Sequence, residues 1–286
     1  MFNLFRFEYR RLFRRISLYI CIGILLMMVM YGLFLMTISI LSEDLDNIFA
    51  MTAYQMVSFT IAMSNITIIT AVFTSIFVCE DRSKGTIKTI RSLGYPRYQL
   101  FLAKYAASAT ATAIMVISSL MISILCAAVV GADFNPVKNT TDFPGMGSLF
   151  GGTMNVFVYA IYEFTVIMAC HSLYFMVSEL VGKTGLSIVI NIFGPGLIYI
   201  ILAVLYGFVY TVFVSLELQA VTDVLEQIAV LFTMYWLPTS ITTLFISLMG
   251  TMDDTGALIG VFVNIGYILL FGGLALLITS KKQVKN

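Results

Sequence analysis

The sequence has little charge. Lys, Arg, Asp and Glu together make up 11% of its 286 residues, while 60% of the residues are hydrophobic. Soluble globular domains typically carry about a quarter charged residues, so this deficit excludes a soluble globule and a large cytoplasmic enzyme. Because a spanning helix needs about 20 apolar residues, the chain has room for roughly six spans. Almost no length is left for a separate soluble domain.

Cysteine and histidine are also scarce. The four cysteines, Cys21, Cys79, Cys126 and Cys170, all fall in apolar runs, and His171 is the only histidine. Cysteines without metal-site spacing behave as small buried hydrophobic residues. The sequence therefore predicts neither a disulfide framework nor a metal site. Since no acid, base and nucleophile converge on one membrane face, we expect no catalytic residues in this chain.

Six apolar runs are long enough to cross a bilayer. They cover approximately residues 16–41, 48–79, 100–131, 155–178, 185–215 and 257–279. A seventh run, about 228–249, contains Pro238, and proline within an apolar stretch breaks or kinks a helix. We therefore predict an all-α membrane protein with one transmembrane domain over residues 1–286. In this arrangement residues 228–249 form a re-entrant hairpin on the outer side, before the sixth span.

The basic residues predict the orientation of these spans. They occur before the first run, between the second and third runs, in the short loop at Lys183 and in the tail from Lys281 to Lys285. Cytoplasmic loops of membrane proteins carry an excess of Lys and Arg. Six spans place both termini and every basic loop in the cytoplasm, whereas a seventh crossing would put the basic tail outside. The outer loops are then acidic and would attract cationic peptides.

The first 15 residues have a helical pattern of apolar residues. Phe2, Phe5, Tyr9, Leu12 and Ile16 fall on one face, between arginines. Such a segment can lie in the headgroup region before turning into the first span. We expect an interfacial helix over residues 1–15, and a positively charged anchor is a compatible alternative.

The cytoplasmic stretch between the second and third runs is the most informative segment. Ile87, Ile90 and Leu93 recur at helical spacing, with basic residues on the flanking face. Gly94 and Pro96 end this pattern. The sequence predicts a short amphipathic helix over about 81–94 that could pass the movement of a cytoplasmic partner to the membrane. A solvated loop held by its positive charge is the alternative.

This stretch resembles the permease subunits of type 2 ATP-binding-cassette exporters. The resemblance rests on an acidic residue, a Gly-Thr-Ile-Lys sequence, a Leu-Gly-x-Pro-Arg sequence and a lysine that opens the next span. The matching positions are Glu80, Gly85, Thr86, Ile87, Lys88, Gly94, Arg97 and Lys104. One departure is Pro96 directly before Arg97, where many relatives have an aliphatic residue and Ser. Within the family, the chain looks most like the small permeases of bacteriocin or lantibiotic immunity exporters.

The resemblance implies the partners of the chain. It identifies residues 81–94 as the coupling helix that docks on a cytoplasmic ATP-binding subunit, present in two copies. Ile90 and Arg91 join the matching residues from Glu80 to Arg97 in this predicted contact. A second permease subunit would complete a homodimer or a heterodimer in the bacterial cytoplasmic membrane. No nucleic acid partner is expected.

ATP and magnesium belong to the partner under this hypothesis, and this chain binds no cofactor. Gly182, Lys183 and Thr184 look like the end of a phosphate-binding loop, but Val177 stands where the motif needs its first glycine. ATP hydrolysis must therefore come from a separate polypeptide. Lys183 and Glu179 are instead candidates for a second contact with that partner, or simply solvated loop residues.

Four residues within the spans are candidates for a substrate pathway: Glu163, His171, Asn191 and Pro195. A carboxylate in mid-membrane is costly and normally faces a cavity or a polar partner, and histidine titrates near neutral pH. Glu163 and His171 are therefore candidates for substrate contact or a proton relay, with helix packing as the alternative. Asn191 and Pro195 interrupt the fifth span, as a hinge that flexes during transport or as a static kink.

The sequence thus predicts the membrane-spanning subunit of an exporter that moves a peptide or another amphipathic or hydrophobic substrate. Antimicrobial-peptide immunity is a specialisation of this function. An ion-coupled secondary transporter that uses Glu163 and His171 is one alternative. A transporter-like membrane sensor is another.

Overall fold

The computed structural model describes residues 2–41, 56–57, 60–61, 64–83, 96–130, 155–215, 221, 224–225 and 254–281. Within these residues the regular structure is helical and includes no strand. The helices are α1 (Phe2–Phe13), α2 (Ile16–Leu41), α5 (Ile66–Ser83), α7 (Arg97–Val130), α8 (Val156–Val181), α9 (Thr184–Ser215) and α12 (Asp254–Lys281). The all-α prediction is therefore confirmed for the described part of the chain.

Five of these helices are long and apolar enough to cross a membrane. Their candidate spans are Ile16–Phe34, Tyr98–Val129, Val156–Val181, Thr184–Val212 and Ala257–Ser280. They coincide with five of the six predicted spans. The second predicted span, 48–79, is described without gaps only from residue 64, and its apolar helix Ile66–Glu80 is shorter. The count of six spans stays a prediction.

The predicted coupling helix overlaps the end of α5. This helix continues through Glu80 to Ser83, so residues 81–83 belong to its last turn rather than to a separate helix. Residues 84–95, and with them the positions from Gly85 to Gly94, lie outside the described residues. The outer hairpin predicted over 228–249 also lies outside them.

The ends of α8 follow from local sequence. Asn155 is its N-cap, with an extended backbone and a side-chain oxygen that accepts a hydrogen bond from the Phe157 N–H at 2.9 Å. At the other end Gly182 has a φ of 71°, and its N–H donates to the Ser178 carbonyl. This left-handed conformation favours glycine. It allows α9 to begin at Thr184, after a turn of only two residues.

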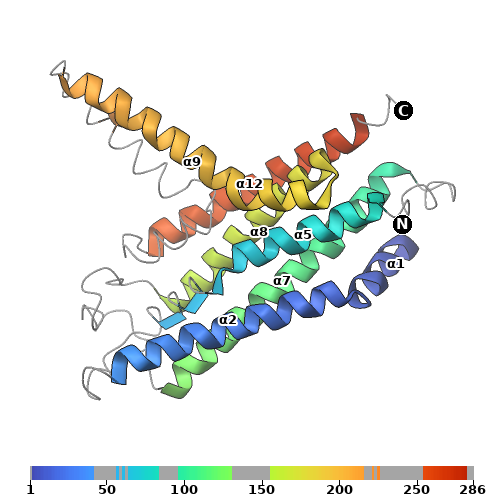
Figure 1. Cartoon of the computed structure of the whole chain (residues 1–286), viewed down its shortest axis with the longest axis horizontal. Coiled ribbons are helices and arrows are strands. Elements are labelled where there is room, and N and C mark those ends of the chain that lie inside the picture. Colours follow the sequence, from blue (N-terminus) through green and yellow to red (C-terminus); the bar gives the residue numbers. More distant parts are fainter. Residues whose placement is uncertain are drawn as a thin grey trace.

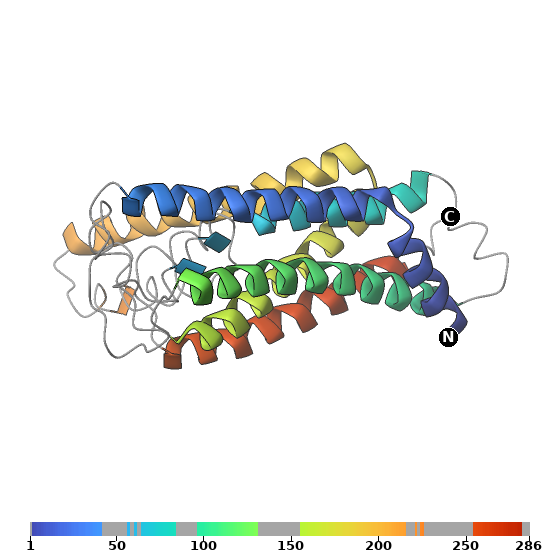
Figure 2. The ribbon, with the colours of Figure 1, turned by 90° about the horizontal axis from the view of Figure 1, so that it is seen from below.

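Helix α8 lies at the centre of the bundle. It contacts α12, α5, α7 and α9, and 61% of its span is buried within the chain. Helices α2 and α7 lie beside α5, and the later half of α9 (orange) diverges from the bundle (Figure 1; Figure 2). Only 6% of the α9 span is buried within the chain. The exposed side chains of α9 are mostly apolar, as expected for a helix that faces lipid or another subunit.

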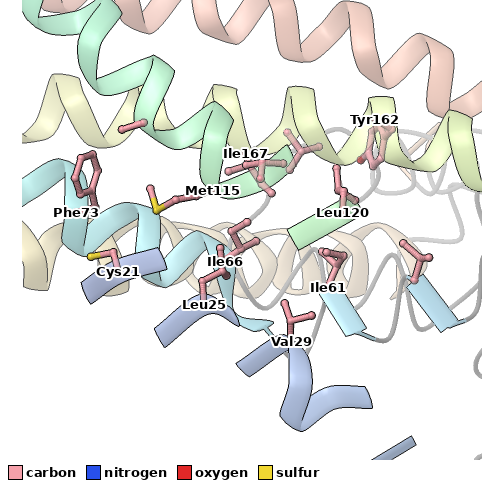
Figure 3. Packing of buried hydrophobic residues seen from close by; sticks show 14 of the residues in the cluster. Cys21, Leu25, Val29, Ile61, Ile66, Phe73, Met115, Leu120, Tyr162 and Ile167 are labelled. Carbon is pink, nitrogen blue, oxygen red and sulfur yellow. The ribbon is translucent and has the colours of Figure 1, made fainter. Parts of the chain in front are cut away.

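The hydrophobic core joins α2, α5, α7 and α8. Figure 3 shows side chains of α2 that point toward those of α5, α7 and α8. The labelled members are Cys21, Leu25, Val29, Ile61, Ile66, Phe73, Met115, Leu120, Tyr162 and Ile167. The four helices are therefore held together by one continuous apolar cluster.

Helix α1 packs against α7. Leu4 and Leu12 are buried, and the Tyr9 hydroxyl lies 2.6 Å from Oγ1 of Thr110. Ile16 was expected to share the apolar face of this segment, but it begins α2 and is exposed. The chain breaks its helix at Arg14 and Arg15, so the periodicity of residues 2–12 does not extend to Ile16.

Candidate functional site

The C-terminal end of α5 is held by an arginine from the turn between α1 and α2. Nη1 of Arg15 lies 3.0 Å from Oε2 of Glu80, and the guanidinium carbon stands 4.6 Å from the centre of the Phe77 ring. The same Nη1 donates to the Phe77 carbonyl at 3.5 Å. One guanidinium group thus makes an ion pair, a cation–π contact and a backbone hydrogen bond to a single helix end.

A lysine from α7 holds the same end of α5. Lys104 is 4% exposed, and its Nζ donates to the Val78 carbonyl at 2.8 Å. Cations near the C-terminal end of a helix interact favourably with its dipole. From α8, the Ser178 carbonyl accepts a bond from Sγ of Cys79 at 3.7 Å. The last turns of α5 are therefore tied to the α1–α2 turn, to α7 and to α8.

A buried polar network joins α5, α8 and α9 about one turn further into the membrane. Nδ2 of Asn191 donates to Oγ of Ser75 at 2.8 Å, to Oγ of Ser178 at 3.1 Å and to the Tyr174 carbonyl at 3.2 Å. Ser187 completes the network, with its Oγ 2.7 Å from Oγ of Ser178 and 3.2 Å from Oγ of Ser75. We call Ser75, Ser178, Ser187 and Asn191 the serine–asparagine network.

One acceptor of the serine–asparagine network, Oδ1 of Asn191, receives no hydrogen bond from the network's hydroxyl groups. The Ser75 and Ser178 hydroxyls donate to carbonyls of their own helices, Ala71 and Tyr174, each at 2.7 Å. Oδ1 of Asn191 is buried and accepts no hydrogen bond from the described residues. A buried amide oxygen without a donor weakens the network relative to a fully paired one. The network can therefore be broken at less cost than its number of bonds suggests.

Helix α9 continues through Pro195 without a break. Proline has no N–H, so the Asn191 carbonyl loses the donor that an uninterrupted helix would supply four residues later. The predicted interruption of the fifth span is thus a proline inside a continuous helix. Asn191 is affected in two ways: its side chain belongs to the serine–asparagine network, and its backbone carbonyl lacks the N–H donor that a residue other than proline at position 195 would supply.

The interface between α7 and α8 is polar and aromatic. Nε2 of His171 lies 2.8 Å from Oγ of Ser108, and the Tyr105 hydroxyl lies 2.6 Å from Oγ of Ser172. The Tyr105 and His171 rings are 5.6 Å apart, and Phe175 packs against both. His171 is fully buried. Its contacts are therefore those of a residue that holds two helices together.

Glu163 lies two turns before His171 on α8. It is 3% exposed, and within the described residues neither a hydrogen bond nor an ion pair is found for its carboxyl group. It does not bond to His171, so the two residues do not form a direct relay in this arrangement. Nearby on the same helix, Oγ1 of Thr165 is 3.5 Å from Nδ2 of Asn264 on α12.

The structure brings only some of the predicted site residues together. Glu80 lies in the cluster at the end of α5, Asn191 lies in the network, and Arg97 is the first residue of α7. Of the residues suggested for a second partner contact, Lys183 is exposed whereas Glu179 is buried. The sequence did not predict the roles of Ser75, Ser178 and Ser187 in the network, nor that of Ser108. Their signal is a small hydroxyl residue at helical spacing within an apolar span.

No group of three or more His, Cys, Asp and Glu side chains that could hold a metal ion is found in the part of the chain that the structure describes. The cysteines are free, and Cys21, Cys79 and Cys170 are buried.

These features define a class: a multi-pass helical membrane protein whose helices are tied together at one end of the bundle by buried polar contacts. A family model described as ABC-2 family transporter protein matches residues 4–194, and the chain belongs to this family. No curated protein matches the sequence. The matched region runs from Leu4 in α1 through α8 into α9 and includes all four residues of the serine–asparagine network. Membership implies a membrane transport component with a partner ATP-binding subunit.

Proposed function

We propose that this chain is the membrane-spanning subunit of an ATP-driven exporter. Its substrate would be a peptide or another amphipathic or hydrophobic molecule, including an antimicrobial peptide in an immunity system. ATP with magnesium would be bound and hydrolysed by two copies of a separate cytoplasmic subunit. A second permease subunit, identical or different, would complete the complex in the bacterial cytoplasmic membrane.

The cluster at the end of α5 carries this proposal. Helix α5 leads directly into the segment that resembles a coupling helix, and its last turns are tied to Arg15, Lys104 and α8. A helix transmits displacement along its axis because its backbone hydrogen bonds keep it stiff. Movement of residues 84–95 would therefore reach α2, α7 and α8 at once. The serine–asparagine network would extend it to α9.

The proposed contact with the ATP-binding subunit consists of Glu80, Gly85, Thr86, Ile87, Lys88, Ile90, Arg91, Gly94 and Arg97. In the proposed pathway, Glu163 is a buried carboxyl group that a substrate or a polar partner could approach when the helices separate. His171 and Asn191 would act on transport through the helix contacts they make. Pro195 would let α9 move relative to the bundle.

The test is purification of the tagged chain in mild detergent from its native membrane. Mass spectrometry would identify stoichiometric companions, and vanadate-sensitive ATPase activity would be measured. We expect an ATP-binding subunit to copurify, and Gly85→Pro or Arg91→Ala to reduce substrate-stimulated ATPase activity. Arg10→Ala is the matched control, because Arg10 is an exposed arginine of α1 that does not belong to the proposed contact.

Two results would overturn the proposal. A chain that purifies alone and transports with a proton gradient would be an ion-coupled carrier, and attention would move to Glu163 and His171. A complex with an ATP-binding subunit that signals to a kinase without moving substrate would be a sensor. Normal transport by a well-expressed Gly85→Pro chain would contradict the docking role of residues 84–95.

A further inference from the structure

Four buried polar atoms outside the contacts above have no hydrogen-bond partner among the described residues. They are Oγ1 of Thr70 and of Thr74 on α5, Oγ1 of Thr112 on α7, and Nδ1 of His171 on α8. All four side chains are fully buried. Buried polar groups in proteins are nearly always hydrogen-bonded to protein or to ordered water. Such atoms on three adjoining helices therefore require a common explanation.

One hydrogen bond indicates how α5 and α7 are aligned. Nζ of Lys104 contacts the Val78 carbonyl, near the beginning of α7 and the end of α5, and the two helices run in opposite directions (Figure 1). Counting one turn from that contact along each helix places Thr74 of α5 near the level of Ser108 of α7. One more turn places Thr70 near the level of Thr112. Because residues four apart share a helix face, both threonines of α5 lie on the face that carries Val78.

The third helix reaches the same level. His171 on α8 bonds to Ser108, which is level with Thr74. Ala71, between the two threonines of α5, packs against Cys170 and Tyr174 of α8. The α5 segment that carries the free hydroxyls thus packs, through Ala71, against the α8 segment that carries the free imidazole nitrogen. All four atoms lie within about two helical turns, or roughly 11 Å along the bundle.

The chemistry of the four atoms selects a small neutral molecule. A hydroxyl group donates one hydrogen bond and accepts two, and an imidazole nitrogen donates or accepts one. No carboxylate belongs to the set, so it lacks the charged oxygen ligands that divalent cations prefer. Water fits, because buried water typically makes about three hydrogen bonds to otherwise unpaired groups. We propose that Thr70, Thr74, Thr112 and His171 form a binding site for ordered water between α5, α7 and α8.

This site has a consequence that does not depend on ATP or on a substrate. Water-mediated hydrogen bonds are nearly as favourable as direct ones and can be remade after a small displacement. Helix α5 can then shift against α7 and α8 without leaving its buried hydroxyls unpaired. The side of α5 that faces the serine–asparagine network has direct bonds instead, so α5 would be held firmly on that side and loosely on this one.

The first test is the sign of a stability change. Thr74→Val and Thr112→Val replace a hydroxyl by a methyl group of similar shape. If ordered water binds there, we expect each variant to lower the apparent melting temperature. If nothing binds, removal of an unpaired buried hydroxyl raises it or leaves it unchanged, and the proposal fails. Thr279→Val is the matched control, since that hydroxyl donates only to the Ala275 carbonyl of its own helix.

The second test holds even where a variant folds poorly, because it uses the unmodified chain in lipid nanodiscs. X-ray pulses generate hydroxyl radicals from bound water, and mass spectrometry measures the oxidation of nearby methionines. Met115 is fully buried and lies one turn from Thr112, whereas Met121 on the same helix is exposed toward lipid. We expect Met115 to be oxidised several-fold faster than Met121. Oxidation of Met115 no faster than that of Met121 would overturn the proposal.

Discussion

Arg15 is the residue at which the N-terminal part of the chain meets the inner end of α5. Its side chain is 10% exposed and that of Glu80 is 29% exposed, so water screens their ion pair only in part. The contact with the Phe77 ring removes further water from the guanidinium group. An arginine in this position contributes more than a surface ion pair, because its planar group can serve three partners.

Substitution of Glu80 tests this contact. We expect Glu80→Gln to destabilise the protein by about 1–2 kcal/mol, between the values for exposed and buried ion pairs. It should also reduce substrate-stimulated ATPase activity in the complex. The apparent melting temperature in detergent gives the first quantity. Arg14→Gln, which changes an exposed neighbour of Arg15, should have little effect. Equal losses from the two variants would mean that charge alone matters, and not this pair.

Two buried asparagines provide a comparison for the serine–asparagine network. Asn191 donates to three partners within 3.2 Å, whereas Asn264 makes one contact of 3.5 Å to Thr165. Asn191→Leu should cost about 1–3 kcal/mol, because it leaves buried acceptors without their donor. Asn264→Leu should cost less. Thermal unfolding of both variants in the same detergent checks the order, and a larger loss for Asn264→Leu would refute our account of the network.

The sequence predicts these residues unequally. Glu80 and Lys104 are predicted by the family resemblance, and Asn191 stands out as an amide in an apolar span. Ser75 and Ser178 do not stand out in the sequence, because a serine in a spanning helix usually donates to a carbonyl of its own helix, as both of these do. That each also accepts a bond from another helix depends on packing, which periodicity does not encode. The water site is hidden for the same reason.

At the scale of the element, apolar length predicts the spans well. The first predicted run, 16–41, has the bounds of α2, and the bounds of α7, α8, α9 and α12 differ from prediction by at most three residues. Hydropathy reports where lipid begins, whereas a helix continues until a cap or a turn ends it. Helix α5 therefore extends past its apolar segment to Ser83. This extension could not be predicted from composition.

The contact between α8 and α12 depends on one glycine. A Cβ atom at Gly260 would stand 2.5 Å from Cε2 of Tyr162, a buried ring that has to move. We expect Gly260→Ala to destabilise the protein by about 1–3 kcal/mol, as overpacking does. Gly266→Ala, on the same helix with no atom within 4 Å of its Cβ, should stabilise it by about 0.5–1 kcal/mol through helix propensity. Opposite shifts in melting temperature are the expected outcome. If both variants stabilise the protein, the close approach at Gly260 is wrong.

At the scale of the whole molecule, the described helices agree with an even number of crossings. Helices α2, α5, α7, α8, α9 and α12 extend along the bundle, and the beginning of α1 and the end of α12 lie at the same end of it (Figure 1; Figure 2). The inner end of α5, the beginning of α7 and the turn between α8 and α9 lie toward that end. Arg15, Lys104 and Lys183 lie toward this end, and the positive-inside bias predicts that it is cytoplasmic.

Cysteine labelling tests this orientation. In a chain whose native cysteines are replaced by alanine, Lys183→Cys and Ser280→Cys introduce thiols at the end that we propose is cytoplasmic. Asn155→Cys introduces one at the opposite end of α8. A membrane-impermeant maleimide should label Asn155→Cys in intact cells, and Lys183→Cys and Ser280→Cys only in inside-out vesicles. Labelling of Ser280→Cys together with Asn155→Cys in intact cells would require an odd number of crossings. The segment 228–249 would then be a seventh span, and the basic tail would lie outside despite its charge.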